Sequence, residues 1–324
     1  MTVATPADTA FNPTGKKLVS VIIPCYNSEK SIGQVVELTL AEFAKSERYE
    51  CEFVLVNDNS KDATFEKIRE LASEHPCVHG INLFRNFGQH NGLMCAMRYA
   101  RGQIILGMDD DLQCQPSQIP AILGKLEEGY DLVYGVYREA PNGMVKNFTS
   151  WLNKVTARKL LGRPKGIRSS NFWAITAQLK EQVVRYTNYN PQLDALFTRL
   201  TTNVGNVEIE SHERVYGSSG YSFSKMVKLW LAYFNYTVVP LRFISGVGVF
   251  TAALGFVAGV VTIIRKLVDP SMMAGWASTI CILLFFFGLV LLTLGIIGEY
   301  LGNIVLSVNS TPQYIVRETV NLDD

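Results

Sequence analysis

Two long uncharged stretches near the C-terminus limit the folds that this chain can adopt. Residues 243–264 contain no Asp, Glu, Lys or Arg, and residues 271–298 contain none either. As helices, both stretches are long enough to cross a hydrocarbon layer of about 30 Å. The linker at 265–270 is too short to form a domain. We therefore predict a membrane region at 241–303 with two transmembrane helices, at about 243–264 and 274–298, and nearly all other residues on one face of the membrane.

The segment before the first stretch, 222–240, has the pattern of an amphipathic helix in a membrane interface. Apolar side chains recur there at helical spacing, and lysines lie outside that stripe. The stripe comprises Phe223, Met226, Val227, Trp230, Leu231 and Phe234, and the lysines are Lys225 and Lys228. The alternative, a core helix of a soluble domain, is less consistent with the uncharged stretches that follow.

Charges and glycines near these stretches bear on their orientation and packing. Basic residues lie on both sides of the predicted membrane region. Those on the side of the large domain are Lys225, Lys228, Arg242 and Arg317, and those in the linker are Arg265 and Lys266. This distribution weakly favours a cytoplasmic domain. Small residues that permit close helix contact are Gly255, Gly259, Gly295, Gly298 and Gly302. They favour packing of the two helices on each other, with a homo-oligomer as the alternative.

Between residues 17 and 221, apolar runs alternate with helical patterns. Strands are predicted at 18–23, 53–56, 78–83, 104–106, 131–135 and 204–209, and helices at 31–45, 63–72, 89–100, 146–161, 179–186 and 192–201. This alternation predicts right-handed crossovers and therefore an α/β domain with a mostly parallel sheet. We expect residues 1–16 to form a loose polar tail and residues 304–324 to form a C-terminal segment on the cytoplasmic side.

Three consecutive acids, Asp109, Asp110 and Asp111, follow the fourth predicted strand. Strands of open α/β sheets deliver ligand groups at their carboxyl ends. Carboxylates this close repel one another unless a cation holds them, and hard oxygen ligands suit Mg²⁺ or Mn²⁺. A divalent metal bridging a diphosphate is therefore the predicted occupant. The alternative is a solvated acidic turn that caps a helix beginning near Pro116.

A fourth acid, Asp58, follows the second predicted strand and is expected at the same edge of the sheet. The chain has no G-x-G-x-x-G after its first strand and no G-x-x-x-x-G-K-[ST], so a nucleotide must be bound in another way. Asp58 is a candidate acceptor for a base or a ribose hydroxyl. The alternative is an Asx turn before the next helix, with Asp62 as its N-cap.

Basic residues and overall composition narrow the classes of ligand. Arg138, Arg163, Lys165 and Arg168 follow the fifth strand and its helix, and guanidinium groups bind phosphate bidentately. A solvated basic face is the alternative. The formal net charge of +1 argues against nucleic acid as the main partner. The six cysteines have no CxxC pair and no metal-ligand spacing, which fits a reducing compartment.

Six ordered segments resemble the family-2 glycosyltransferases with a GT-A fold, in particular the polyprenyl-phosphate transferases. That group includes dolichyl-phosphate mannose synthase and the bacterial undecaprenyl-phosphate glucosyl and aminoarabinose transferases. The segments are residues 21–27, 56–62, 86–90, 108–113, 212–221 and 298–302. The resemblance implies metal-dependent, inverting transfer of a sugar from a nucleotide diphosphate, with a UDP-sugar favoured, onto polyprenyl (undecaprenyl) phosphate. It also implies a multi-pass protein of the bacterial inner membrane.

The resemblance implies a role for each matching position. Pro24, Tyr26 and Asp58 would line the nucleotide pocket; Asp109, Asp111 and Gln113 would hold Mg²⁺ or Mn²⁺; and Arg138 and Arg214 would contact phosphates. The remaining substrate-binding candidates are Asn27, Asn86, Gln89, His90, Asp110, Arg168, His212, Ser219 and Tyr221.

Three positions depart from the family pattern. Ser28 stands where a glutamate is usual, Asn59 where a glycine is usual, and Gly220 where a lysine is frequent. Asn can still adopt the left-handed conformation that a glycine would supply. Lys225 is a candidate to replace the missing lysine.

Two alternative functions have specific features against them. A processive polysaccharide synthase would need a Gln-x-x-Arg-Trp segment and more membrane spans than this chain has. A catalytically idle scaffold would not need the acids at 58, 109 and 111. Because these acids all precede Ser222, a fragment ending near Gly220 is expected to retain nucleotide binding.

Overall fold

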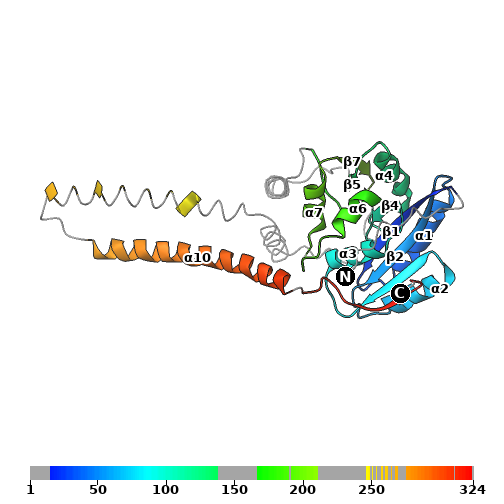
Figure 1. Ribbon diagram of the computed structural model, residues 1–324, viewed down its shortest axis with the longest axis horizontal. Helices are drawn as coiled ribbons and strands as arrows, with labels where there is room; N and C mark the ends of the chain where they lie inside the picture. The colour runs from blue at the N-terminus through cyan, green and yellow to red at the C-terminus, as the bar shows by residue number, and fades with distance from the viewer. Residues whose placement is uncertain are drawn as a thin grey trace. The chain divides into compact units, whose positions relative to one another are not determined.

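An eight-stranded sheet, formed within the described residues, organises the first of two units into which the chain divides (Figure 1). The computed structural model describes residues 15–137, 166–189, 191–210, isolated positions between 246 and 268, 275–309 and 311–322. The first unit comprises Met1–Gly220 and Pro312–Asp324, and the second comprises Tyr221–Thr311. The last residues of the chain therefore belong with the sheet.

The strands are β1 (Lys17–Cys25), β2 (Tyr49–Asn57), β3 (Val78–Leu83), β4 (Ile104–Gly107), β5 (Leu132–Tyr137), β6 (Trp173–Thr176), β7 (Val204–Ile209) and β8 (Val316–Val320). Their order in the sheet is β7-β5-β6-β4-β1-β2-β3-β8. Strand β1 pairs in parallel with β2 and β4, as β2 does with β3 and β5 does with β7. Strand β6 is antiparallel to β4 and β5, and β8 is antiparallel to β3. The predicted mostly parallel sheet is confirmed.

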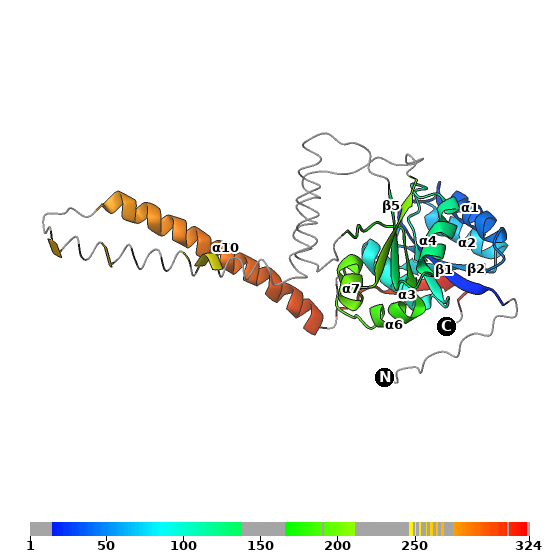
Figure 2. The same cartoon turned by 90° about the horizontal axis from the view of Figure 1, so that it is seen from above.

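Helices cover both faces of this sheet (Figure 2). Among the described residues, the helices of the first unit are α1 (Ile32–Ala44), α2 (Thr64–Glu74), α3 (Gln89–Tyr99), η1 (Pro116–Gln118), α4 (Ile119–Leu126), α6 (Ala177–Val183) and α7 (Leu193–Leu200). The helix predicted at 146–161 lies outside the described residues. Val21 and Ile23 pack into the core beneath α1, α2 and α4, whereas Ile22 packs into the core beneath α3, α6 and α7. Successive strand residues face opposite sides, so a strand covered on both faces is apolar along most of its length.

Two strands were not predicted from the sequence. Strand β6 has only four residues and lies between β4 and β5, which it joins by antiparallel pairing. Strand β8 lies in the expected C-terminal segment and adds an edge strand beside β3, with Asn82 opposite Glu318. A fragment ending near Gly220 would lack β8 and would expose the edge of β3. The expectation that such a fragment retains nucleotide binding stays a prediction, to be tested on a fragment that lacks this edge strand.

The second unit contains α10 (Trp276–Val308), coloured orange to red in Figure 1. Among the described residues, its segment Phe286–Val308 is the one helix long and apolar enough to cross a membrane, with a mean hydropathy of 1.9 and none of it buried. The second predicted span ended at 298, but α10 continues to Val308, because one Glu at 299 does not interrupt a helix. The predicted interfacial helix and most of the first predicted span lie outside the described residues.

Gly107, at the end of β4, provides a test of the packing beneath the acids. A Cβ atom there would overlap the indole of Trp173, its partner on β6. We expect Gly107→Ala to lower the free energy of unfolding by about 1–3 kcal/mol, since overpacking forces neighbouring side chains or backbone to shift. The measurement is the midpoint of urea unfolding of the detergent-solubilised protein, followed by tryptophan fluorescence.

Gly124 is the matched control, because it lies in α4 and a Cβ atom there would meet no atom of another element within 4 Å. Gly124→Ala should leave the midpoint unchanged or raise it, since alanine is favoured over glycine in a helix by about 1 kcal/mol. Equal midpoints for the two variants would contradict the packing argument.

Candidate active site

The polar loops after β1, β2 and β4 meet at one edge of the sheet. Cys25 is in register with Asn57, and Ile22 is in register with Gly107. The backbone continues this alignment, because Asp58 N–H donates to the Cys25 carbonyl at 2.9 Å. Parallel strands end at a common edge, so Asp58 and the three acids after β4 lie on the same edge, as predicted.

Asp58 holds the loop that leads into α3. Its carboxylate accepts the backbone N–H of Phe87 at 2.7 Å and that of Gly88 at 2.8 Å. Gly88 has a φ of +89°, a conformation that favours glycine. Burial raises the pKa of Asp58, and the two backbone hydrogen bonds offset part of that increase. Neither interpretation made from the sequence included this contact, because it joins residues about thirty positions apart.

The first residue of α3, directly after this loop, contacts the first acid of the triplet. Gln89 donates from Nε2 to Asp109 Oδ1 at 2.9 Å, and Asn171 donates from Nδ2 to Asp109 Oδ2 at 2.7 Å. Gln89 was predicted as a site residue, whereas Asn171 was missed. Asn171 reaches the end of β4 because it precedes β6, whose Trp173 is paired with Gly107. Because β6 was not predicted from the sequence, no sequence pattern placed Asn171 near Asp109.

Asp110 is directed toward the loop after β1. The Ser28 hydroxyl donates to Asp110 Oδ2 and accepts the backbone N–H of Tyr26 at 3.0 Å, while Ser28 N–H donates to Thr64 Oγ1 at 2.8 Å. Burial raises the pKa of Asp110, the Ser28 hydrogen bond opposes this change, and the charge of Asp111 adds to it. The serine that departs from the family pattern therefore connects the β1 loop to the acid triplet.

Asp109, Asp111 and Gln113 supply oxygen atoms of the kind that Mg²⁺ and Mn²⁺ prefer. Asp111 Oδ1 accepts the backbone N–H of Gln113 at 3.0 Å, in a turn where Leu112 has a φ of +58°. The negative charges of Asp109 and Asp111 contribute, after burial, to raising the pKa of the Cys114 thiol to about 12. The donor set and the negative field both fit a divalent cation.

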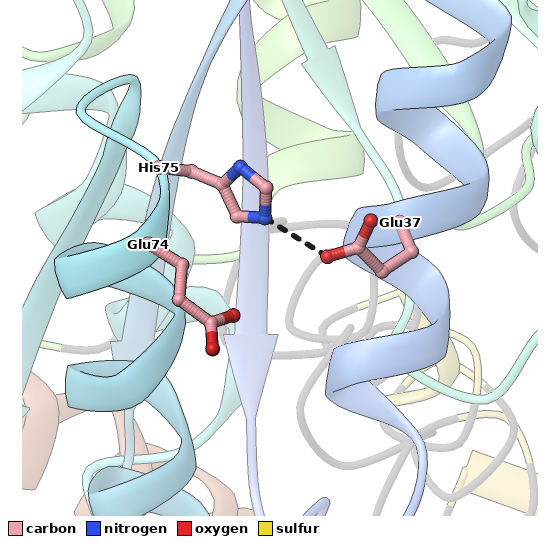
Figure 3. A group of neighbouring side chains, drawn as sticks. All are labelled: Glu37, Glu74 and His75. Atoms are coloured by element: carbon pink, nitrogen blue, oxygen red, sulfur yellow. Dashed lines mark hydrogen bonds and ion pairs between the residues drawn. The ribbon is translucent and has the colours of Figure 1, made fainter.

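A different group, Glu37, Glu74 and His75, has ligand atoms that all lie within 4.8 Å of one another (Figure 3). Within the described part of the chain, it is the one such group of three His, Cys, Asp or Glu residues. His75 Nε2 lies 2.9 Å from Glu37 Oε1. Glu74 and His75 are at the end of α2 that leads into the start of β3, so this group is separate from the acids after β4.

The loops after β1 and β2 are joined by reciprocal hydrogen bonds. Asn27 N–H donates to Ser60 Oγ at 3.0 Å, and Lys61 N–H donates to Asn27 Oδ1 at 2.9 Å. Asn27 and Asn59 have φ values of +57° and +54°, so the expected left-handed conformation of Asn59 is confirmed. Tyr26 is 47% exposed and Pro24 is partly buried beside it.

The remaining predicted residues have different positions. Arg168 donates to the Tyr137 carbonyl at 3.0 Å and so holds the end of β5. Asn86 is exposed, and burial lowers the pKa of His90. The predicted residues Arg138, His212, Arg214, Ser219 and Tyr221 lie outside the described residues.

Residues 20–186, which carry this edge of the sheet, match the model of the family described as glycosyl transferase family 2. The chain belongs to glycosyl transferase family 2. This confirms the resemblance found in the sequence motifs. The matched range begins within β1 and includes β2 to β6 and all of the loops described above.

Curated relatives match almost the full length of the chain. An undecaprenyl-phosphate 4-deoxy-4-formamido-L-arabinose transferase of Proteus mirabilis is 33% identical over 313 residues, covering 94% of each chain. A protein of the same name from Shewanella sediminis is 32% identical, covering 93% of this chain and 92% of that one. The uncharacterized glycosyltransferase YkcC of Bacillus subtilis is 30% identical, covering 94% and 95%.

A solved structure supports the GT-A fold alone. Glucosyl-3-phosphoglycerate synthase from Mycobacterium tuberculosis, in complex with phosphoglyceric acid, aligns with a TM-score of 0.50 at 18% sequence identity. The alignment covers 69% of this chain and 81% of that chain.

The contact between Asp58 and the loop before α3 leads to a prediction about local opening. In Asp58→Asn, the side-chain NH₂ replaces one acceptor oxygen, so one of the two backbone N–H groups loses its partner. A lost hydrogen bond of roughly 1–3 kcal/mol predicts exchange of the Phe87 and Gly88 amides about tenfold faster or more. Hydrogen–deuterium exchange with mass spectrometry measures this.

The control is Glu66→Gln, which removes one exposed negative charge from α2. It should leave exchange of residues 86–89 at the wild-type rate. Unchanged exchange in Asp58→Asn would show that the carboxylate does not hold this loop.

Proposed function

We propose that this protein is a membrane-anchored, metal-dependent, inverting glycosyltransferase that moves a sugar from a nucleotide diphosphate onto polyprenyl phosphate. The observation that carries the proposal is the meeting of Asp58, the β1 loop and the acid triplet at one edge of a family 2 domain. The acceptor class follows from the names of two relatives that match more than nine-tenths of the chain. A UDP-sugar is the favoured donor.

The residues of the chain have separable roles in this proposal. Asp109, Asp111 and Gln113 would hold Mg²⁺ or Mn²⁺, which when bound neutralises the charge of the departing diphosphate. Gln89 and Asn171 orient Asp109 through its two oxygen atoms. Preorganised ligands of this kind require little rearrangement as the glycosidic bond breaks.

A lipid acceptor is consistent with the apolar helix. The segment Phe286–Val308 of α10 can cross a membrane by its length and composition. We propose that a second span at 243–264 pairs with it, and that the sheet domain lies at the cytoplasmic face of the bacterial inner membrane. The excess of basic residues on the domain side supports that orientation.

The acceptor would attack without a protein general base. A lipid monophosphate is largely ionised near neutral pH, because its second pKa is about 6. Its oxygen is already a nucleophile, so the enzyme must orient it toward the anomeric carbon. Arg138 and Arg214 are the proposed orienting groups, since guanidinium binds phosphate bidentately.

Asp111→Asn tests the metal site. Removing a ligand charge should lower the transfer rate by about a thousandfold, since such electrostatic stabilisation of the leaving group is worth several kcal/mol. The assay incubates purified protein with undecaprenyl phosphate and a panel of nucleotide sugars, and mass spectrometry identifies the lipid product. Transfer of one sugar per lipid supports the proposal, several sugars per lipid would favour a polymer synthase, and no turnover would favour a scaffold.

Glu37→Gln is the matched control, because it removes a carboxylate from the other candidate metal group, at α1 and α2. It should retain wild-type activity. If Glu37→Gln abolishes transfer and Asp111→Asn does not, the functional metal is bound by the group of Glu37, Glu74 and His75, which contradicts the proposal.

His212→Asn and Arg214→Gln distinguish direct attack from base catalysis. Direct attack predicts that Arg214→Gln impairs the use of lipid phosphate most, while His212→Asn keeps a substantial part of the wild-type rate. Initial rates at varied lipid phosphate, between about pH 6.5 and 8, measure the difference around the imidazole pKa. Loss of transfer in a folded His212→Asn protein that still binds donor would establish a histidine base instead.

A further inference from the structure

A continuous chain of side-chain hydrogen bonds joins the last strand of the protein to the proposed donor site. Glu318 of β8 accepts at Oε1 from Asn82 Nδ2 at 2.8 Å, and Asn82 Oδ1 accepts from Asn57 Nδ2 at 2.9 Å. Asn57 Oδ1 accepts from the Ser60 hydroxyl at 2.5 Å and from Ser60 N–H at 3.3 Å. Ser60 Oγ in turn accepts the backbone N–H of Asn27 at 3.0 Å.

Only one orientation of the two amides satisfies this chain. The carboxylate of Glu318 accepts hydrogen bonds, so Asn82 must present its NH₂ group to it. Asn82 then presents its oxygen to Asn57, and Asn57 presents its own oxygen to Ser60. The backbone N–H of Ser60 can only donate, so both ends of the chain require the same orientation.

Burial makes these contacts costly to lose. Asn57 is 3% exposed and Asn82 is 8% exposed. A buried amide that loses its partner keeps its full desolvation penalty. The Asn82 hydrogen bond, followed by the Arg69 guanidinium, holds the pKa of Glu318 below its usual range, so the group that accepts from Asn82 stays ionised.

The far end of the chain sets the shape of the loop at 57–61. That loop contains Asp58, and Asn59 in the left-handed conformation. Through Ser60 it also fixes Asn27, which follows the exposed Tyr26. The family resemblance places Tyr26 and Asp58 in the nucleotide pocket and makes Asn27 a substrate-binding candidate.

We propose that Glu318 is a positioning residue for the nucleotide-diphosphate donor, acting through Asn82 and Asn57 on the loop at 57–61. This inference rests on the proposed function. It assigns a part of the donor site to a strand that follows α10 in the sequence, whereas Asp58 and the acid triplet precede Ser222. A strand that serves only to cover the edge of β3 would affect stability without a selective effect on the donor.

Full-length Glu318→Ala tests the proposal. We expect the donor KM, and the Kd for UDP or GDP with Mn²⁺, to rise by about five- to thirtyfold, with the acceptor KM unchanged, because the Asn82 amide loses its acceptor. Glu318→Gln keeps an oxygen acceptor for Asn82 and should restore both constants to near the wild-type values. Arg69→Gln removes the other partner of Glu318 and should also leave them near wild type.

A matched control and a double variant separate positioning from general destabilisation. Glu70→Ala, on α2 beside Arg69, removes an exposed carboxylate that pairs with Lys67 and should not change donor binding. Asn82→Ala should raise the donor KM as Glu318→Ala does, and the double variant should add nothing further. Additive effects, or equal increases in the donor and acceptor KM, would overturn the proposal.

The two readouts also separate this proposal from the proposed function. A wild-type protein that transfers sugar, with an unchanged donor KM in Glu318→Ala, overturns the positioning role alone. A wild-type protein that binds UDP or GDP but transfers no sugar to undecaprenyl phosphate contradicts the proposal that polyprenyl phosphate is the acceptor. In that case, weaker nucleotide binding by Glu318→Ala still supports the positioning role. Absence of any nucleoside diphosphate binding by the wild type would overturn both.

Discussion

The parallel pairing of β1 with β2 and with β4 is the constraint on which the rest of the site depends. These strands are largely buried on both faces, and the polar side chains within them, Ser20 of β1 and Glu52 of β2, are bonded to each other. The polar residues that can meet a ligand therefore lie where each strand ends. The three following loops must then share one edge of the sheet. Asp58 and the acid triplet are therefore neighbours in space although about fifty residues separate them in the sequence.

Polar groups at this edge are buried deeply enough to require partners from other loops. Burial raises the pKa of both Asp58 and Asp110, and each carboxylate is stabilised by donors from a different segment. The loop before α3 binds Asp58, Gln89 at the start of α3 binds Asp109, and the β1 loop binds Asp110 through Ser28. Each loop is thus fixed by a side chain of another, which preorganises the edge for a charged ligand.

The sequence alone predicted six of the eight described strands and the position of the acids where strands end. Apolar runs and turn residues are local features, so they can be recognised without knowing the fold. The predicted bounds of β3 are those observed, and β1, β2 and β4 differ from prediction by only a few residues. What local patterns could not indicate were contacts made by long-range pairing. Asn171 was missed because β6 is short and antiparallel, and Glu318 was missed because β8 pairs with a strand more than 230 residues earlier. The contacts of Asp58 were missed for the same reason.

Strand β8 also covers the edge of β3, which would otherwise be an edge of the sheet. An uncovered edge strand presents unpaired backbone groups that promote association with other chains. Residues 316–320 cover that edge, and Asn321 extends the contact by donating from Nδ2 to the carbonyls of Ala72 and Val78 at 2.6 and 3.1 Å. His79 Nδ1 contacts the Asn321 carbonyl at 2.5 Å on the same edge. These bonds hold Asn321 against the connection between α2 and β3. Glu318, within β8, contacts the loop at 57–61 through Asn82 and Asn57. The sheet domain is therefore complete only when the chain has continued through α10 to β8, so the helix that the proposed function places in the membrane lies, in the sequence, between two parts of the sheet domain.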